Sequence, residues 1–385
     1  MKIMTTNVLA GLASMALALG VLAPGLLQKA AAAQGGVPKF EPDPYWPKVL
    51  PHNWIFGQVS GVYVDSHDHI WVIHRPGTLD EYDKYAESGE GDCCVAAPPV
   101  LEFDMAGNVI QAWGGPGQGY EWPSNEHGIY VDYKENVWVT GNEDKEGNKD
   151  TQILKFTNSG KFLLQIGHHG KTAGSNDTEN LNRATEVVVY PKTNEVFVAD
   201  GYGNRRVIVF DADTGVYKRH WGAYGNKPDD GVPVKRTYEG QGPSQFDLVH
   251  GIRLSNDDLL YVADRKNNRV QVFRIDGTFV KEGYVERKTR SSEGTAGGVA
   301  FSADKQQEFF YVPDGPDKRV WIVNRETMET VGFFGGHGGT GIAEFSHIHN
   351  IATDSKGNVY LSQVNKGGRR PLRWNYKGMS SAPGP

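Results

Sequence analysis

Short runs of alternating apolar and polar residues follow one another along most of the chain. Within each run, β-branched or aromatic residues stand at every second position, as in residues 61–75 and 127–140. This period of two is the pattern of a half-buried strand. Asp, Asn, Gly and Pro separate the runs, and these residues favour tight turns. The pattern therefore predicts an all-β protein built from short strands.

The strand pairs recur as a repeat. Each unit has an apolar strand, a polar turn and a second strand rich in aromatic and β-branched residues, and the units lie about 50 to 65 residues apart, a period near that of propeller blades. The units start at Gly61, His127, Glu186, His250, Gly298 and His349. We therefore expect residues 34–385 to form a single six-bladed β-propeller domain. Closure of the ring requires a strand pair between its two ends, and we expect the segment near residues 40–48 to supply it.

The N-terminal segment has a different pattern. Residues 8–27 form an apolar and small-residue run that follows Lys2, and Ala31 and Ala33 offer an Ala-x-Ala cleavage site. These features are typical of a secretory signal peptide, which we assign to residues 1–33. A single membrane anchor is the alternative, because the run is long enough to span a bilayer. The signal peptide predicts a secreted or periplasmic protein without a membrane attachment after cleavage.

Composition and charge narrow the class of partner. The 40 Lys and Arg residues are fewer than the 46 Asp and Glu residues, which gives a net charge of -6. Proteins that bind nucleic acid present a basic face, so we expect no nucleic-acid partner. The 48 Gly and 20 Pro residues fit the many turns of a propeller. We expect a monomer that acts on a small-molecule or peptide substrate.

Histidine stands before the inner strand in every second repeat. At this position the repeats carry Ser60, His127, Glu186, His250, Gly297 and His349. Alternate blades of a six-fold ring lie about 120° apart, so the imidazoles converge as three protein ligands around an open coordination position. This arrangement predicts a metal site, with zinc as the first choice, although imidazole also binds copper, iron and nickel. The alternative is three unrelated histidines that line the channel.

Other polar residues are expected at the same mouth of the channel. The end of a second strand lies beside the start of the first strand of its hairpin, so Arg75, Tyr202 and Arg265 should face the histidines. Arg75 suits a clamp for a substrate carboxylate, because its guanidinium is planar and permanently charged; a salt bridge across the rim is the alternative. Tyr202 suits a general base, with packing on the rim as the alternative.

An insertion separates the second and third strands of the first repeat. It covers residues 76–99, is rich in acidic residues and contains the adjacent Cys93 and Cys94. In an oxidising compartment we expect these cysteines to form a vicinal disulfide, and a reactive or metal-binding thiol pair is the alternative. Because the insertion starts at the end of a second strand, we expect it to cover the mouth as a lid.

Three repeats share a further sequence pattern. Asp200, Asp264 and Asp314 end second strands, and each is followed by an Arg-Val pair at the start of the next strand. This pattern resembles the NHL repeat. Because Asp and Arg side chains tie turns by hydrogen bonds, we expect these aspartates to have a structural role.

The residues at the predicted mouth resemble a known enzyme family. The resemblance rests on residues 57–62, His74-Arg75, His127-Gly128, residues 200–202, His250, residues 262–265 and His349. Together they are similar to the peptidyl-α-hydroxyglycine α-amidating lyases. The resemblance implies a catalytic zinc on His127, His250 and His349, with Arg75 and Tyr202 acting beside it and Arg265 as a secondary anion contact. The implied reaction cleaves R–CO–NH–CH(OH)–COOH to a terminal amide and glyoxylate.

The resemblance also implies a second metal. Family members carry a buried calcium on two backbone carbonyls and an Asp that follows the third histidine. The matching positions here are Val62, Ile129 and Asn350. Asn keeps an oxygen ligand but lacks the charge of Asp, which weakens a calcium site.

Two other functions stay open at this point. One is a non-catalytic NHL propeller that binds a protein or glycan partner, with the metal serving structure alone. The other is a metal-dependent propeller hydrolase similar to lactonases. Those enzymes hold calcium with acids and Asn, so the three histidines argue against this reading.

Overall fold

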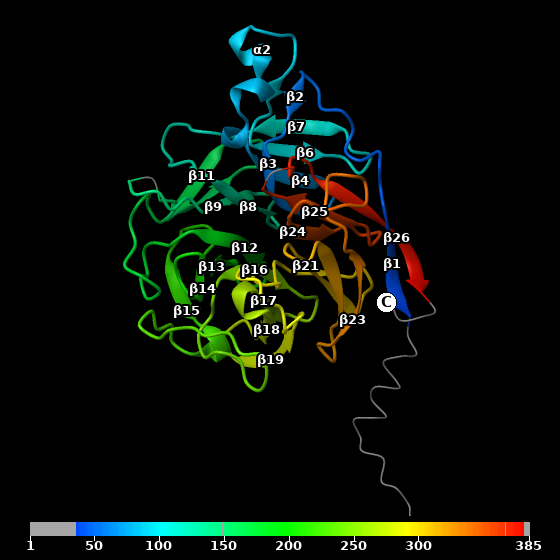
Figure 1. Cartoon of the computed structure of the whole chain (residues 1–385). Coiled ribbons are helices and arrows are strands. Elements are labelled where there is room, and N and C mark those ends of the chain that lie inside the picture. Colours follow the sequence, from blue (N-terminus) through cyan, green and yellow to red (C-terminus); the bar gives the residue numbers. More distant parts are fainter. Residues whose placement is uncertain (1–35, 148, 366, 381–385) are drawn as a thin grey trace, which may run out of the picture. The chain divides into compact units, whose positions relative to one another are not determined.

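The computed structural model describes residues 36–147, 149–365 and 367–380. The predicted signal peptide lies outside the described residues. Within them the strands form one two-stranded sheet and six four-stranded sheets, and the six-bladed propeller predicted from the repeats is confirmed. The four-stranded sheets are arranged around a common centre in Figure 1, with sequential blades as neighbours.

Each blade runs from an inner strand at the ring centre to an outer strand at the rim. Blade 1 contains β3 (Gln58–Val64), β4 (Ile70–Arg75), β6 (Val100–Phe103) and β7 (Val109–Trp113). Blade 2 contains β8 (Glu126–Val131), β9 (Val137–Gly141), β10 (Ile153–Phe156) and β11 (Phe162–Ile166). Blade 3 contains β12 (Ala184–Tyr190), β13 (Glu195–Asp200), β14 (Arg206–Asp211) and β15 (Tyr217–Trp221).

The other blades repeat this order. Blade 4 contains β16 (Val249–Leu254), β17 (Leu260–Asp264), β18 (Arg269–Phe273) and β19 (Phe279–Tyr284). Blade 5 contains β20 (Ala300–Phe301), β21 (Phe309–Asp314), β22 (Arg319–Asn324) and β23 (Thr330–Gly335). Blade 6 contains β24 (Ile348–Thr353), β25 (Val359–Gln363), β26 (Leu372–Ser380) and the N-terminal β1 (Val37–Pro42).

The N-terminal strand closes the ring. β1 pairs antiparallel with β26, so that Val37 faces Ser380 and Pro42 faces Trp374. Closure by strand pairing was expected, but the strand starts and ends earlier than the predicted segment at 40–48. Every blade thereby has four strands, and the two ends of the propeller are held by backbone hydrogen bonds.

The hydrophobic core lies between neighbouring blades. Trp138 of blade 2 is fully buried in one cluster with Val187 and Phe210 of blade 3 and Ile252 of blade 4. Burial of a large apolar side chain stabilises the fold by about 1.5–3 kcal/mol. Because each sheet hides its faces against the next sheet, stability depends on the closed ring.

The Asp and Arg residues of the NHL-like pattern form buried ion pairs in two blades. Arg206 Nε donates to Asp200 Oδ2 at 2.9 Å, and Arg269 Nε donates to Asp264 Oδ2 at 2.8 Å, with all four side chains fully buried. In blade 5, Asp314 accepts instead from Trp321 Nε1 at 2.9 Å. These contacts fit the structural role expected for the aspartates.

The insertion after β4 lies at the rim of blade 1. It contains short helical turns at Pro76–Thr78 and Glu81–Asp83, the helix α2 (Tyr85–Ser88) and the strand β5 (Val95–Ala96), which pairs in parallel with β2 (Trp54–Ile55). Cys93 and Cys94 are joined by a disulfide. Among the helices of the described residues, none has the length and apolar character needed to cross a bilayer.

The position of the insertion corrects the expectation of a lid. α2 projects beside blade 1, away from the centre of the ring (Figure 1). The β2–β5 pair lies outside the blade, and Asp83 forms an ion pair with Arg369 at 2.5 Å. These contacts hold the insertion at the rim, and the disulfide therefore stiffens a peripheral loop.

His74 connects the segment before β3 to the end of the insertion and predicts a pH dependence. Its Nδ1 accepts from the Gly57 backbone N–H at 3.1 Å and its Nε2 donates to the Pro98 carbonyl at 3.1 Å. Burial lowers the pKa of His74 to about 4. The unfolded chain binds a proton near pH 6.5, so the free energy of unfolding falls as the pH falls from about 6.5 to about 4, by about 3 kcal/mol in total.

Urea unfolding at pH 7.5 and pH 4.5 measures this effect. We expect His74→Gln to lose about 2.5 kcal/mol less stability than the parent between the two pH values, slightly less than the full effect because pH 4.5 lies above the pKa of His74 in the folded state. Both proteins contain the other buried histidines, so the contribution of these residues to the pH dependence of stability cancels when the two losses are subtracted. An equal loss in both proteins would show that His74 does not remain neutral in the folded state.

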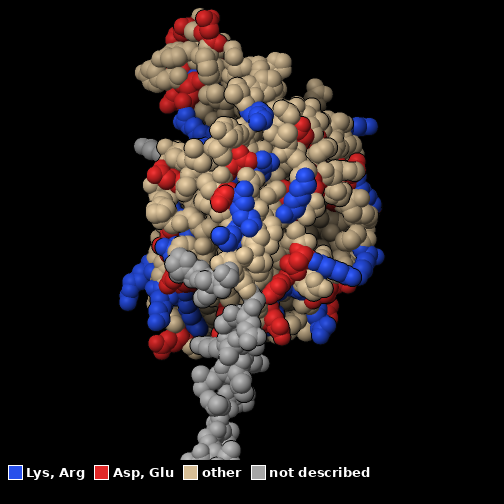
Figure 2. Space-filling view, turned by 90° about the vertical axis from the view of Figure 1, so that its right-hand side faces the viewer, with Lys and Arg blue, Asp and Glu red and all other residues tan. Residues whose placement is uncertain are grey.

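Charged side chains of both signs mix on the surface. Figure 2 shows Lys and Arg interspersed with Asp and Glu over the face that it displays. This mixture agrees with the small net charge of -6.

Candidate metal centre and cavity

Three buried histidines meet at the centre of the propeller. His127, His250 and His349 are the second residues of β8, β16 and β24. Their ring centroids are 4.6 to 5.0 Å apart, and one potential ligand nitrogen of each lies within 4.8 Å of the others. The near-equal spacing is what alternate blades of a six-fold ring produce. The predicted convergence is therefore found in the structure.

A bulge in the inner strand positions each ring residue. The strand register shifts at this point in blades 1, 2, 3, 4 and 6. Such an extra residue bends the strand and re-aims its side chain, here toward the channel. In blade 3 the residue at the bulge is Thr185, so the alignment that placed Glu186 at this position is wrong by one residue.

Backbone carbonyls of the following blades orient the imidazoles. His127 Nδ1 contacts the Thr185 carbonyl at 2.9 Å, His250 Nδ1 the Gly297 carbonyl at 2.6 Å and His349 Nδ1 the Ser60 carbonyl at 2.7 Å. A carbonyl only accepts, so each Nδ1 carries the proton. Each Nε2 is then left with a free lone pair. This second contact is typical of histidines that bind metals.

Burial keeps the three histidines neutral. It lowers the pKa of His127 to about 3 and holds the pKa values of His250 and His349 well below the ordinary range. The nearby Arg75 guanidinium acts in the same direction on His127 and His349. Neutral imidazole is the form that binds metal. Three such groups around a common point fit zinc or another borderline transition metal.

Tyr202 lies beside two of the histidines. Its hydroxyl oxygen is 3.3 Å from His127 Nε2 and 3.2 Å from His250 Nε2. The residue follows β13, and Arg183 Nη2 donates to the Tyr202 carbonyl at 2.8 Å. The hydroxyl therefore points at the free lone pairs where a metal would bind, as the position of Tyr202 in the repeat predicted.

Arg75 is a partly buried cation whose hydrogen-bond partners are neutral. Its Nε donates to the Glu126 carbonyl at 2.7 Å, while Nη1 and Nη2 donate to the Gln58 and Asn142 side-chain oxygens at 3.2 and 3.3 Å. Burial lowers the pKa of Arg75, but an arginine stays charged in proteins. Within the part of the chain that the structure describes, no carboxylate forms an ion pair with Arg75. The carboxylates of Glu126, Asp150 and Glu143 act on Arg75 only without direct contact, so its guanidinium has no ion-pair partner and is available to an anion.

A cavity of about 330 Å³ is shared by Arg75, Tyr202 and His349. It is lined by Arg75, Asn142, Tyr202, Arg265, Ser291, Glu293, Pro316, His347, His349, Val364 and Asn365. No residue of the insertion at 76–99 is among them. Asn142 belongs to the loop at residues 141–150, which starts at the end of β9 and is expected at this mouth, whereas Glu293 comes from a loop that no sequence pattern indicated.

Arg265 and His347 occupy the wall of the cavity. Arg265 starts the short helical turn Arg265–Asn267, and its guanidinium forms an ion pair with the exposed Glu293 carboxylate. Unlike Arg75, it already has a counter-charge. Burial and the nearby Arg265 lower the pKa of His347 to about 4, and His347 lies outside the group of three converging histidines.

The calcium site implied by the resemblance does not fit the residues found here. Asn350 Oδ1 accepts from the Val62 backbone N–H at 3.4 Å, and Asn350 Nδ2 donates to Glu186 Oε1 at 3.1 Å. The same Glu186 oxygen is 2.5 Å from Arg253 Nη1. The Asn350 amide is therefore engaged, and a guanidinium supplies the positive charge in this part of the channel.

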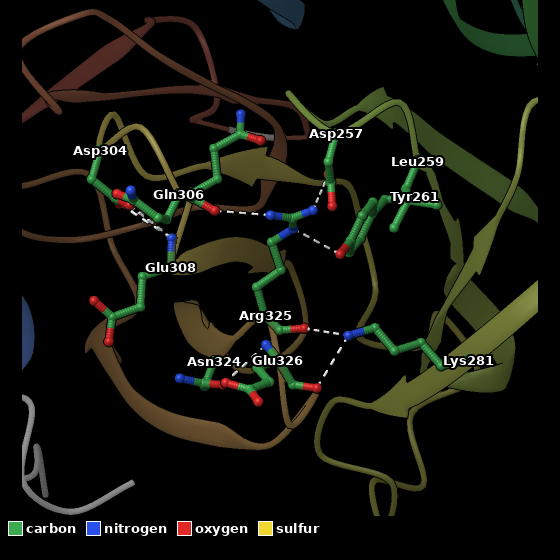
Figure 3. A pocket seen from close by; sticks show the side chains of 11 residues that line it. Asp257, Leu259, Tyr261, Lys281, Asp304, Gln306, Glu308, Asn324, Arg325 and Glu326 are labelled. Carbon is green, nitrogen blue, oxygen red and sulfur yellow. Dashed lines mark hydrogen bonds and ion pairs between the residues drawn. The ribbon is translucent and has the colours of Figure 1, made fainter.

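A second cavity, of about 570 Å³, has a different character. It lies between blades 4 and 5 (Figure 3). Arg325 fills its centre, and bonds to the Tyr261 hydroxyl at 2.9 Å, to the Gln306 carbonyl at 2.8 Å and to the Asp257 carboxylate. Its polar groups thus satisfy one another. The smaller cavity at the histidines, with Arg75 facing no anion, is the better candidate for a functional site.

Comparisons with known proteins agree with the fold and with a resemblance to amidating lyases. Residues 246–273 match the NHL repeat. The chain is 26% identical to peptidyl-glycine alpha-amidating monooxygenase A of Xenopus laevis over 338 residues, which cover 84% of this chain and 32% of that protein. It is 25% identical to peptidyl-alpha-hydroxyglycine alpha-amidating lyase 2 of Drosophila melanogaster over 346 residues, which cover 85% of this chain and 75% of that protein.

The chain thus spans about a third of the length of the frog protein. Among solved structures, a streptogramin B lyase is similar with a TM-score of 0.49 and 11% identity, over 88% of this chain and 98% of that chain. Over most of its propeller, the chain resembles amidating enzymes that include peptidyl-α-hydroxyglycine α-amidating lyases.

Proposed function

We propose that the chain is an exported, zinc-dependent carbon–nitrogen lyase that converts R–CO–NH–CH(OH)–COO⁻ to R–CO–NH₂ and glyoxylate. The observation that carries the proposal is Arg75, a partly buried cation without an ionic partner, in one cavity with Tyr202 and His349 of the histidine ring. The relatives named as amidating lyases support the same reaction class. The signal-peptide pattern supports export, and the net charge of -6 supports the absence of a nucleic-acid partner.

Different groups would bind the hydroxyl and the carboxylate of the substrate. His127, His250 and His349 would hold zinc, which as a Lewis acid supplies a positive centre for the substrate hydroxyl oxygen. Arg75 binds the substrate carboxylate through its planar fork and fixes the carbinol carbon near Tyr202. Asn142 and Gln58 hold that fork in place from the other side.

Tyr202 moves the proton that the reaction requires. In its phenolate form, Tyr202 accepts the proton of the substrate hydroxyl. The oxygen lone pair then forms the C=O bond of glyoxylate while the C–N bond breaks. The leaving amide nitrogen takes up the proton from Tyr202, so that atoms and charges balance and the residue returns to its starting form.

A product assay tests the proposed reaction. Purified protein with one zinc per chain is incubated with α-hydroxyhippurate, and benzamide and glyoxylate are measured separately. We expect the two products in a one-to-one ratio. A fully metallated protein that releases neither product would refute this substrate class. Hydrolysis of a lactone, or binding of a glycan without turnover, would favour the other functions considered above.

Replacement of Tyr202 by phenylalanine should separate proton transfer from binding. The aromatic ring keeps its packing, and the carboxylate contact of Arg75 is untouched, so we expect KM to change less than threefold. General acid–base catalysis contributes about 10²–10⁴-fold, and kcat should fall by that order. Steady-state kinetics with matched zinc content measures both values. A kcat within a factor of three of the parent would exclude Tyr202 as the proton carrier.

A further inference from the structure

A charged pair lies in the channel next to the histidine ring. Arg253 follows His250 by three residues on β16, and Glu186 follows Thr185 on β12. The two residues are buried, with 8% and 1% of their surface exposed, and Arg253 Nη1 is 2.5 Å from Glu186 Oε1. Neither residue lines the cavity at the histidines. The pair is therefore separate from the proposed catalytic groups.

Hydrogen bonds from the pair reach inner strands of several blades. Arg253 Nη1 donates to the Ile252 carbonyl at 3.1 Å, and Nη2 donates to the Ile351 carbonyl of β24 at 3.3 Å. Glu186 Oε2 accepts from the Ile252 backbone N–H at 2.8 Å. Asn350 completes the network, since it bonds to Glu186 and to the Val62 N–H of β3.

The network has the chemistry of a cation site. A carboxylate, an amide and backbone carbonyls from opposite sides of a ring are the oxygen groups that calcium binds. Here the Arg253 guanidinium contacts two of these carbonyls and the carboxylate. A guanidinium is always charged and donates in several directions. A divalent ion beside it would be repelled, because like charges a few ångströms apart in a buried setting interact strongly.

We propose that Arg253 is a built-in cation that takes the place of calcium in the channel. The guanidinium neutralises Glu186 and connects β12, β16 and β24, so the ring closes without a bound calcium ion. The inference concerns Arg253 and the groups around it in the channel, next to the histidines, and does not depend on the proposed lyase reaction.

Calcium content and thermal unfolding of the parent protein give the first test. The protein is equilibrated with 1 mM CaCl₂, desalted and analysed for calcium, and its Tm is measured with CaCl₂ and with EGTA. We expect no stoichiometric calcium and the same Tm in both buffers. One retained calcium per chain, with a lower Tm in EGTA, would overturn the proposal.

A charge exchange gives the second test. Arg253→Met leaves Glu186 buried without an ionic partner, and Asn350→Asp adds a second carboxylate. We therefore expect the Tm of the double variant to rise when calcium is added. The control is Arg219→Met, which removes the arginine paired with Glu195. Arg219 lies on the outer strand β15 and not in the channel, so we expect this variant to show no response to calcium. If Arg253→Met lowers Tm no more than Arg219→Met, the guanidinium does not have the proposed role. Failure of Arg253→Met alone to fold would support it.

Discussion

The His250→Ala variant should lose the bound metal and at least about 10³-fold in kcat/KM. A catalytic metal supplies several kcal/mol of stabilisation of charge in the transition state, and each 1.36 kcal/mol is a factor of ten in rate. Two remaining imidazoles are too few for the three protein ligands that a catalytic zinc site normally has. Metal analysis after desalting and turnover of α-hydroxyhippurate measure the two losses.

His347→Ala is the matched control for this variant. His347 lines the cavity next to the histidine ring and is partly buried, but it does not belong to the converging group of three. We expect it to keep a full equivalent of metal. If His250→Ala retained stoichiometric zinc and full turnover, the histidine ring would not be the metal site.

Arg75→Met should raise KM and lower kcat/KM by about 10²-fold for a substrate with a free carboxylate. A hydrogen bond to a charged group contributes about 1.5–3 kcal/mol, and the bidentate contact of a guanidinium lies at the upper end of that range. We would measure kcat/KM for the carboxylate substrate and for its primary amide, which lacks the negative charge. A loss confined to the carboxylate substrate reports the charge contact, whereas an equal loss on both reports altered packing. We expect the variant and the parent to differ far less on the amide.

Arg265→Met provides the comparison for Arg75. Arg265 faces the same cavity but is paired with Glu293, so its removal should cost less than tenfold on the carboxylate substrate. An Arg75→Met variant that lost as much activity on the amide as on the carboxylate would show that Arg75 maintains the fold of the site and does not bind the substrate anion.

The propeller and the histidine ring were predictable because both follow from the repeat. The alternation of apolar residues predicts the strands. The occurrence of His127, His250 and His349 in alternate repeats predicts that their side chains converge. The same logic placed Tyr202 near them, since the turn after a second strand returns to the start of the first. The one-residue error at Glu186 arose because a bulge shifts the register of an inner strand without leaving a signal in the alternation.

Contacts between distant segments were beyond the sequence pattern. Asn142 reaches Arg75 from the next blade, and Glu186 reaches Arg253 from the neighbouring blade; no local period encodes either contact. A charged residue on an innermost strand, as Arg253 is, was the available signal for a polar network in the channel. The rim position of residues 76–99 depends on the β2–β5 pair and the Arg369 contact, which composition does not reveal.

Reconstitution with zinc tests the central claim most directly. The protein is stripped of metal with a chelator, titrated with zinc, and assayed for glyoxylate release from α-hydroxyhippurate at each addition. Activity should rise linearly and level off at one zinc per chain. Undiminished glyoxylate release by the stripped protein, or none at one full equivalent, would contradict a zinc-dependent lyase.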